Sequence, residues 1–230
     1  MRRGVACWKT SLEGSIHVTE NSIYQRSIKR VLDVAGAGAG LLASAPFCAI
    51  AAASIKLESK GPVFYRQERI GLDGRSFQML KFRSMLRLED SYDADGQPLD
   101  NYDRVTRVGR VLRATSLDEL PQLLNVLKGD MSLVGPRPTL GYQVDRYDAR
   151  QRGRLKVRPG LTGLAQVNGR NSLSWEQKID FDLQYVDKLS LGLDATIIAK
   201  TFGVILRQES VAFQGHDALS QHQGDYRVNI

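Results

Sequence analysis

The feature that most limits the fold of this chain is a run of 22 residues without charge, 34–55, rich in alanine and glycine. A helix rises 1.5 Å per residue, so a run of this length is long enough to cross a bilayer. Three interpretations are open: a helix that spans a membrane, a helix buried in a soluble core, and a re-entrant helix that enters and leaves on one side.

The flanks and the centre of this run favour the re-entrant interpretation. The flanking cations are Arg26, Lys29 and Arg30 before it and Lys56, Lys60, Arg66 and Arg69 after it. Because Lys and Arg mark the cytoplasmic side of a membrane segment, a spanning helix would place one cluster on the wrong side. Pro46 removes a backbone hydrogen bond and favours a kink, and the hydroxyl of Ser44 can serve the interrupted backbone.

The rest of the sequence divides around this segment. We expect a flexible leader (1–24), a re-entrant membrane helix (25–58), a globular domain (59–208) and a polar C-terminal tail (209–230). The leader contains no long apolar stretch and is not expected to be a secretory signal.

Charge and composition narrow the classes of partner. The net charge of +7, from 32 Lys and Arg against 25 Asp and Glu, suits nucleic acid, phospholipid head groups or phosphorylated small molecules. Cys7 and Cys48 predict neither a disulfide framework nor a metal site. His17, His216 and His222 lie in the polar ends, so a mechanism based on histidine is not expected. Neither a P-loop nor GxGxxG nor HExxH is present.

Periodicity predicts an α+β fold that is mostly helical. A β-hairpin is expected from strands 63–70 and 77–85 around a glycine-containing turn. The helices are expected at 106–113, 116–130, 142–152, 175–188 and 194–207, and Gly129 is expected to end the second of them. Loops are expected at 89–103 and 157–174. The last helix carries an apolar face that either packs on the core or lies on a bilayer surface, as amphipathic helices do.

Two neighbouring carboxylates, Asp118 and Glu119, are candidates for chemistry. With Ser116 they form a capping-box pattern, so a purely structural role at a helix start is the plain alternative. Five cations stand in motif-like settings between Gly and Pro turns and could together hold a diphosphate: Lys81, Arg83, Arg113, Arg137 and Arg158. A carboxylate beside a phosphate can hold Mg²⁺ or attack phosphorus.

Four motifs carry a resemblance to a known family. They are GPVFYRQERIG, KFRSM, TSLDELPQLLNVLKGDMSLVGPRP and VRPGLTGLAQVNGR. Through them, residues 30–206 resemble the small monotopic phosphoglycosyl transferases, also called bacterial sugar transferases. The third motif is long and highly specific.

The resemblance implies a reaction and its residues. Asp118 would be the nucleophile on the β-phosphate of a UDP-sugar, with loss of UMP and formation of a phosphosugar-aspartate. Glu119 would bind Mg²⁺, and four of the cations, Lys81, Arg113, Arg137 and Arg158, would face the phosphates and nucleotide. The acceptor would be undecaprenyl phosphate, at the cytoplasmic face of the bacterial inner membrane. The membrane helix of the family breaks at a Ser-Pro pair; here the pair is Ala45-Pro46, with Ser44 one residue earlier.

Several functional alternatives remain at this level. Segments 169–182, 93–99 and 207–220 are most similar to family members that use N-acetylated sugars, which favours an N-acetylhexosamine phosphate over galactose or glucose 1-phosphate. The reaction would be the first membrane step of glycoconjugate assembly, with downstream glycosyltransferases as possible partners. A non-catalytic membrane adaptor would be expected to lose the two carboxylates or the cations, and both are present. A nucleic-acid-binding protein would not need the uncharged run.

Overall fold

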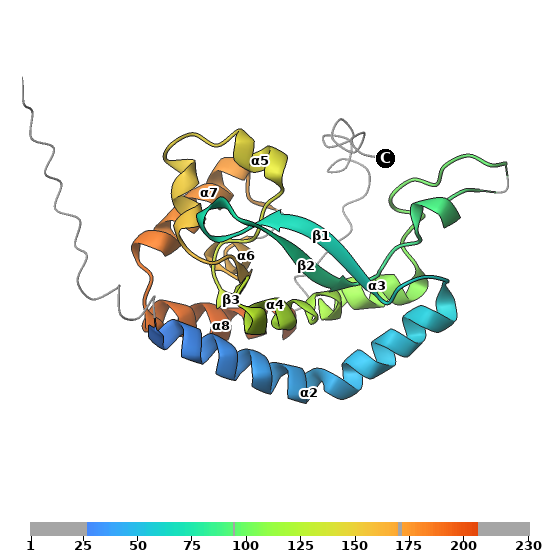
Figure 1. Ribbon diagram of the computed structural model, residues 1–230, viewed down its shortest axis with the longest axis horizontal. Coiled ribbons are helices and arrows are strands. Elements are labelled where there is room, and N and C mark those ends of the chain that lie inside the picture. Colours follow the sequence, from blue (N-terminus) through green and yellow to red (C-terminus); the bar gives the residue numbers. More distant parts are fainter. Residues whose placement is uncertain (1–26, 94, 170–171, 207–230) are drawn as a thin grey trace, which may run out of the picture.

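The computed structural model describes residues 27–93, 95–169 and 172–206, and confirms the α+β class (Figure 1). The predicted tail, Cys7 and the three histidines lie outside the described residues, as do the predicted leader and the start of segment 25–58. The helices are α2 (Lys29–Glu58), α3 (Arg107–Ala114), α4 (Gln122–Lys128), α5 (Gly141–Asp145), α6 (Leu164–Val167), α7 (Trp175–Asp187) and α8 (Leu191–Leu206). The strands are β1 (Phe64–Ile70), β2 (Ser76–Phe82), β3 (Ser132–Val134) and β4 (Gly160–Thr162).

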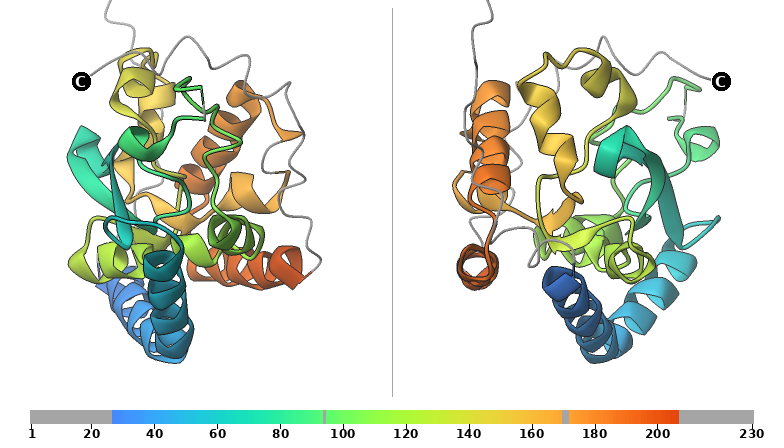
Figure 2. Two further views of the ribbon diagram at one scale, coloured as in Figure 1. Left: turned by 90° about the vertical axis from the view of Figure 1, so that its right-hand side faces the viewer. Right: turned by 60° about the vertical axis from the view of Figure 1, so that its left-hand side comes forward.

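The uncharged run forms the middle of α2, a helix of 30 residues that bends part-way along its length (Figures 1 and 2). Pro46 lies inside the helix and is the physical cause of the bend. Its backbone nitrogen carries no hydrogen to donate to the carbonyl four residues earlier, and its ring crowds that carbonyl. Ser44 donates to the carbonyl of Leu41 at 3.4 Å and so adds a contact within the same helix.

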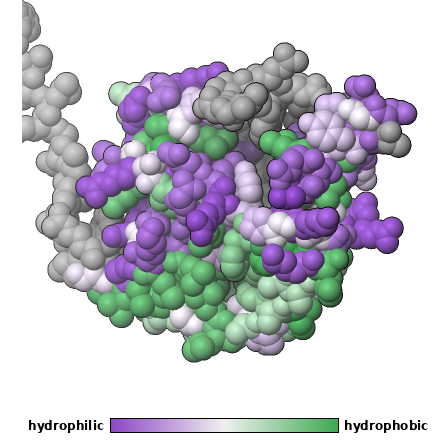
Figure 3. Space-filling view, turned by 45° about the vertical axis from the view of Figure 1, so that its right-hand side comes forward, coloured by the Kyte–Doolittle hydropathy of each residue, from purple (hydrophilic) through white to green (hydrophobic). Residues whose placement is uncertain are grey.

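Most of α2 lies outside the core. It is long and apolar enough to cross a membrane, and only 11% of its most apolar window is buried. Leu42, Phe47 and Ile50 are exposed, and apolar surface covers the base of the molecule (Figure 3). Burial in a soluble core, one of the three sequence interpretations, therefore does not describe this helix.

The N-terminal end of α2 is fixed to the globular part by buried polar contacts. Lys29 forms an ion pair with Asp194 of α8 at 2.6 Å. Asp33 accepts hydrogen bonds from the Ser132 hydroxyl at 3.0 Å and from the Leu133 backbone N–H at 2.9 Å. This arm of the helix is thereby attached to both α8 and β3.

The C-terminal end of α2 returns to the same globular part. The Glu58 carboxylate accepts from the backbone N–H groups of Arg107 and Val108, at 2.7 and 3.0 Å, and so caps α3. Arg83 donates to the carbonyl of Ser59 at 2.9 Å, directly after the helix. Both ends of α2 therefore contact one body, and the bent middle projects away from it (Figure 1).

The predicted hairpin is confirmed. β1 and β2 are antiparallel, with Tyr65 opposite Lys81, and the turn contains Gly71 and Gly74. Asn125 of α4 accepts from the Leu80 backbone N–H at 2.9 Å and donates to the Gln78 carbonyl at 2.7 Å. These two bonds join the free edge of β2 to α4.

Three sequence expectations about local structure were wrong in detail. The helix expected at 142–152 is split into α5 and a 3₁₀ segment, Gln151–Lys156. The loop expected at 157–174 contains β4, which pairs in parallel with β3, and the short helix α6. The helix expected from residue 116 begins at Gln122. Its end is as predicted, because Gly129 adopts the left-handed conformation at its C-terminus.

Candidate active site

The two candidate carboxylates lie in a tight turn between α3 and α4. Ser116 has a φ of 58°, and a 3₁₀ turn, Leu117–Glu119, follows it. The predicted capping box does not form: the Ser116 side chain makes no cap hydrogen bond. A capping residue normally has extended backbone, whereas the left-handed backbone of Ser116 directs its side chain elsewhere. Asp118 and Glu119 therefore precede the helix instead of starting it.

Glu119 is the centre of a cluster of charges from three parts of the fold. Lys81, at the end of β2, donates to its Oε1 atom at 2.8 Å. Arg137 donates to the same atom at 2.6 Å and to Oε2 at 3.4 Å. Arg137 belongs to residues 135–138, here called the GPRP loop, which follows β3. The tertiary fold thus brings together three of the predicted site residues that are 18 or more positions apart.

The surroundings shift the pKa values of the two carboxylates in opposite directions. Burial disfavours the charged form of Glu119, but Arg137 and Lys81 outweigh this effect and hold its pKa well below the ordinary value. Burial raises the pKa of Asp118, and the charge of Lys81 opposes that rise. Within the described residues, the ion pairs of the turn involve Glu119 and none involves Asp118. Asp118 is therefore the carboxylate that remains open to a ligand.

Arg113 extends the cluster on the α3 side. Its Nε donates to the Ser84 hydroxyl at 2.8 Å, and its charge acts on Asp118. Burial lowers the pKa of Arg113 and Asp118 opposes this shift. Ser84 was not singled out from the sequence, although it lies within the KFRSM motif. A hydroxyl that orients a cation can be identified only when both partners are placed in space.

The other two predicted phosphate-facing cations contact other parts of the fold. Arg83 donates to the carbonyls of Ser59 and Lys60, and so fixes the chain as it leaves α2. Arg158 donates to the Gly129 carbonyl at 3.0 Å, at the C-terminal end of α4, whereas the carboxylates precede its N-terminal end. In the part of the chain that the structure describes, neither residue forms a hydrogen bond or ion pair with Glu119.

The carboxylates offer limited ligation for a metal ion. No group of three or more His, Cys, Asp or Glu residues that could hold one occurs within 27–93, 95–169 and 172–206. Oε1 of Glu119 accepts from both Lys81 and Arg137, while Oε2 has only the 3.4 Å contact. Mg²⁺ is commonly held by one or two carboxylates together with phosphate oxygens. The open carboxylate of Asp118 and Oε2 of Glu119 fit that requirement when a diphosphate supplies the other ligands.

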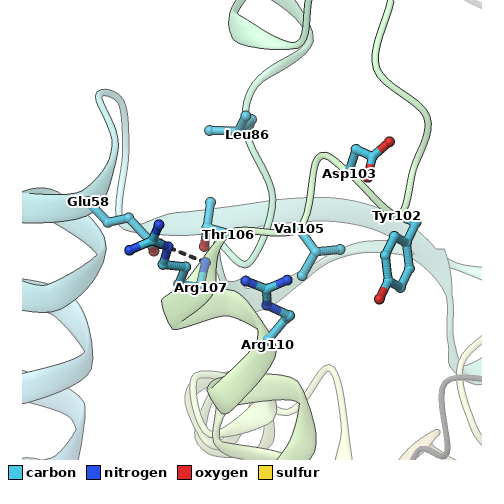
Figure 4. A pocket seen from close by; sticks show the side chains of 8 residues that line it. All are labelled: Glu58, Leu86, Tyr102, Asp103, Val105, Thr106, Arg107 and Arg110. Atoms are coloured by element: carbon cyan, nitrogen blue, oxygen red, sulfur yellow. Dashed lines mark hydrogen bonds between the residues drawn. The ribbon is translucent and has the colours of Figure 1, made fainter. Parts of the chain in front are cut away.

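Two pockets lie away from the carboxylates. One, of about 250 Å³, lies where α2 ends and α3 begins, and its charged lining residues are Glu58, Asp103, Arg107 and Arg110 (Figure 4). The other, of about 420 Å³, lies between the hairpin turn and α5. The acidic and basic residues of the first balance, and Glu58 is already engaged as a cap. Neither pocket has the excess positive charge that a diphosphate site requires.

Comparison with known proteins identifies the family. A sequence profile described as bacterial sugar transferase matches residues 24–208, which is most of the chain. The chain belongs to the bacterial sugar transferase family. The resemblance seen in the four motifs is thereby confirmed, and the matched region includes α2, the carboxylates and the cations around them.

Curated relatives share this region at substantial identity. The chain is 42% identical over 202 residues to an uncharacterised sugar transferase, EpsL, of Bacillus subtilis, covering 88% of this chain and 98% of the relative. It is 48% identical to a UDP-glucose:undecaprenyl-phosphate glucose-1-phosphate transferase of Caulobacter vibrioides, covering 79% and 71%. It is 41% identical to a UDP-galactose-lipid carrier transferase of Erwinia amylovora, covering 80% of this chain but 41% of that protein.

Proposed function

We propose that this protein transfers a sugar 1-phosphate from a UDP-sugar to undecaprenyl phosphate and releases UMP. The observation that carries the proposal is the carboxylate of Asp118, which has no ion pair among the described residues, next to a Glu119 carboxylate bound by Lys81 and Arg137. An anionic nucleophile can approach a diphosphate only where cations offset the combined negative charge.

In the first step, a carboxylate oxygen of Asp118 attacks the β-phosphorus of the UDP-sugar. The new bond makes an acyl phosphate that carries the sugar, and the bond from the β-phosphorus to the bridging oxygen breaks. UMP leaves with the electron pair. Arg113, Lys81 and Arg137 lie around the carboxylates and supply the positive charge for this step. The charge pairs of Glu119 fix two of these cations before the donor binds.

In the second step, a phosphate oxygen of undecaprenyl phosphate attacks the same phosphorus. The bond to Asp118 breaks, its carboxylate is restored, and the product is a lipid diphosphate sugar. A lipid acceptor requires a site close to the bilayer surface. We propose that α2 provides it as a re-entrant helix, because both of its ends contact one globular body and its apolar bend is exposed. The globular part would face the cytoplasm.

Mg²⁺ is proposed as the cofactor, held by Glu119 and Asp118 together with donor phosphate oxygens. When bound, it would offset charge on the diphosphate and on the departing UMP. Activity should be lost in excess chelator and return when Mg²⁺ is added, and Glu119→Gln should weaken that response. Full activity in chelator would exclude the ion.

The sugar has two candidates. The names of the Caulobacter and Erwinia relatives contain UDP-glucose and UDP-galactose, which favours a neutral hexose and a place in exopolysaccharide synthesis. The sequence segments described above favour an N-acetylhexosamine, and this stays a prediction. We propose the neutral hexose first, because the relative named for UDP-glucose is 48% identical over 190 residues.

A UMP-release assay with undecaprenyl phosphate and a panel of UDP-sugars tests the proposal. One donor class should give turnover, and Asp118→Asn should abolish both turnover and the sugar label that wild-type protein retains without acceptor. An amide is a far weaker nucleophile than a carboxylate. Near-normal turnover in the Asn variant would reject Asp118 as nucleophile, and no turnover with any donor would favour the adaptor.

A further inference from the structure

A buried polar network lies against the backbone of the GPRP loop. Arg154 of the Gln151–Lys156 segment donates to the Asp182 carboxylate of α7, to the Tyr147 hydroxyl and, at 2.9 Å, to the backbone carbonyl of Arg137. The Tyr147 hydroxyl donates to the hydroxyl of Thr139 at 3.2 Å. The side chains of Arg154 and Asp182 are only 4% and 2% exposed.

The start of the same loop is fixed by backbone hydrogen bonds. The Gly135 N–H donates to the Thr162 carbonyl at 2.9 Å, and the Gly160 N–H donates to the Pro136 carbonyl at 2.8 Å. The loop is thus held by β4 before Arg137 and by the buried network at and after it. Its backbone position determines where the Arg137 guanidinium meets Glu119.

Burying this ion pair costs free energy, so a contribution to stability does not explain the network. Arg154 Nε and Asp182 Oδ1 are buried and have no hydrogen-bond partner among the described residues. Burial raises the pKa of Asp182 to about 6, against the opposing charge of Arg154. A buried ion pair can often be replaced by apolar side chains without loss of stability. What the guanidinium supplies, and apolar side chains do not, is a rigid fork of donors that fixes several acceptors at once.

We infer that Arg154, held by Asp182, is a positioning residue that fixes the GPRP loop and so directs the Arg137 guanidinium onto Glu119 beside the nucleophile. The inference rests on the proposed function. It assigns Arg154 an effect on the reaction that acts through Arg137, without contact with substrate.

A matched pair of double variants tests this role. Arg154→Met with Asp182→Leu removes the buried pair. Arg150→Met with Asp180→Leu removes an exposed ion pair, at 2.6 Å, whose two residues are each close in sequence to the corresponding residue of the buried pair. Thermal unfolding and UMP release are measured for both. The buried-pair variant should unfold near the wild-type temperature and lose about tenfold or more in kcat/KM, because a small displacement of a catalytic group is costly. The exposed-pair variant should retain activity.

Coupling to Arg137 separates positioning from a general structural effect. In an Arg137→Lys background, the buried-pair substitutions should cost less than about twofold further, since residues that act through one group are not additive. Wild-type activity in the buried-pair variant, or an undiminished loss in the Arg137→Lys background, would overturn the inference. If the buried-pair variant does not fold, Arg154→Lys replaces it in the same measurements. This variant keeps the positive charge but lacks the planar set of guanidinium donors. Wild-type protein without UMP release would instead reject the proposed function.

Discussion

The two neighbouring carboxylates of this protein have different surroundings, and that difference gives them different properties. Glu119 is bound by Lys81 and Arg137, while Asp118 is more buried than a surface carboxylate and has no ion pair in the described part of the chain. A reaction that needs one anionic nucleophile and one fixed charge partner can use this division. The sequence shows two adjacent acids, and the contacts distinguish them.

The pH profile should report on Asp118. Attack requires its carboxylate form, so turnover should fall as pH decreases through its raised pKa. The charge of Glu119 contributes to this rise and the charge of Lys81 opposes it. Glu119→Gln should therefore move the acid limb of residual activity to lower pH, and Lys81→Met should move it to higher pH. Shifts in the opposite directions would contradict this account of the site.

Ser116 provides a test of backbone conformation at the turn. Its φ of 58° is unfavourable for a residue with a side chain, and its hydroxyl does not cap the following turn. Ser116→Gly should increase the free energy of unfolding by roughly 0.5–1 kcal/mol, measured by chemical denaturation in detergent. Ser116→Ala keeps the unfavourable conformation and serves as the control with little change. A destabilised glycine variant would indicate that the hydroxyl has a role in the fold.

At the scale of elements, the candidate active site depends on how closely α3 approaches the segment that follows β2. A Cβ atom on Gly109 would lie 2.0 Å from the Ser84 carbonyl oxygen, so only glycine allows this contact. Ser84 in turn accepts from Arg113 of the same helix. The packing of one backbone against another therefore places a cation of the site.

Gly109→Ala should displace α3 from Ser84 and reduce both stability and activity. The expected loss of stability is about 1–3 kcal/mol, as for other overpacked positions. Gly192→Ala in α8 is the matched control, since a Cβ atom there meets nothing within 4 Å. Thermal unfolding and UMP release of both variants provide the measurement. Equal behaviour of the two variants would refute the close approach as the reason for glycine.

At the scale of the whole molecule, α2 contacts the globular part at two points. Its N-terminal end binds α8 and β3, and its C-terminal end caps α3. The turn that carries Asp118 and Glu119 lies between α3 and α4, and α4 packs on α2. In the proposed topology, a helix held at both ends therefore sets the depth of the carboxylates relative to the lipid phosphate.

The proposed topology predicts the same accessibility for both ends of α2. Single cysteines replace Ser27, before the helix, and Arg75, in the exposed hairpin turn, in a background without Cys7 and Cys48. Both should resist a membrane-impermeant reagent in intact cells and react after lysis. Labelling of one position alone from outside would show a spanning helix. Pro46→Leu is the companion variant, and it should convert part of the population to a spanning form with parallel loss of activity.

Much of the architecture follows from local sequence. The hairpin, α3, α7 and the end of α4 are where periodicity and turn residues place them, because alternation, an N-cap Thr106 and a left-handed Gly129 act over a few residues. The expected capping box at Ser116 failed for the opposite reason. The left-handed backbone conformation of Ser116 occurs where α3 meets the turn before α4, and no local sequence pattern predicts it.

The sequence by itself determined the family and the long apolar helix, and it predicted the two candidate carboxylates, since each depends on a contiguous pattern. Only the tertiary structure decided which cations serve them. Lys81, Arg113 and Arg137 converge on the carboxylates, whereas Arg83 and Arg158 bind backbone carbonyls at the ends of α2 and α4. All five cations stand in similar motifs and carry the same charge, so the sequence does not distinguish them. The role of each cation depends on which acceptor the fold brings within hydrogen-bond distance.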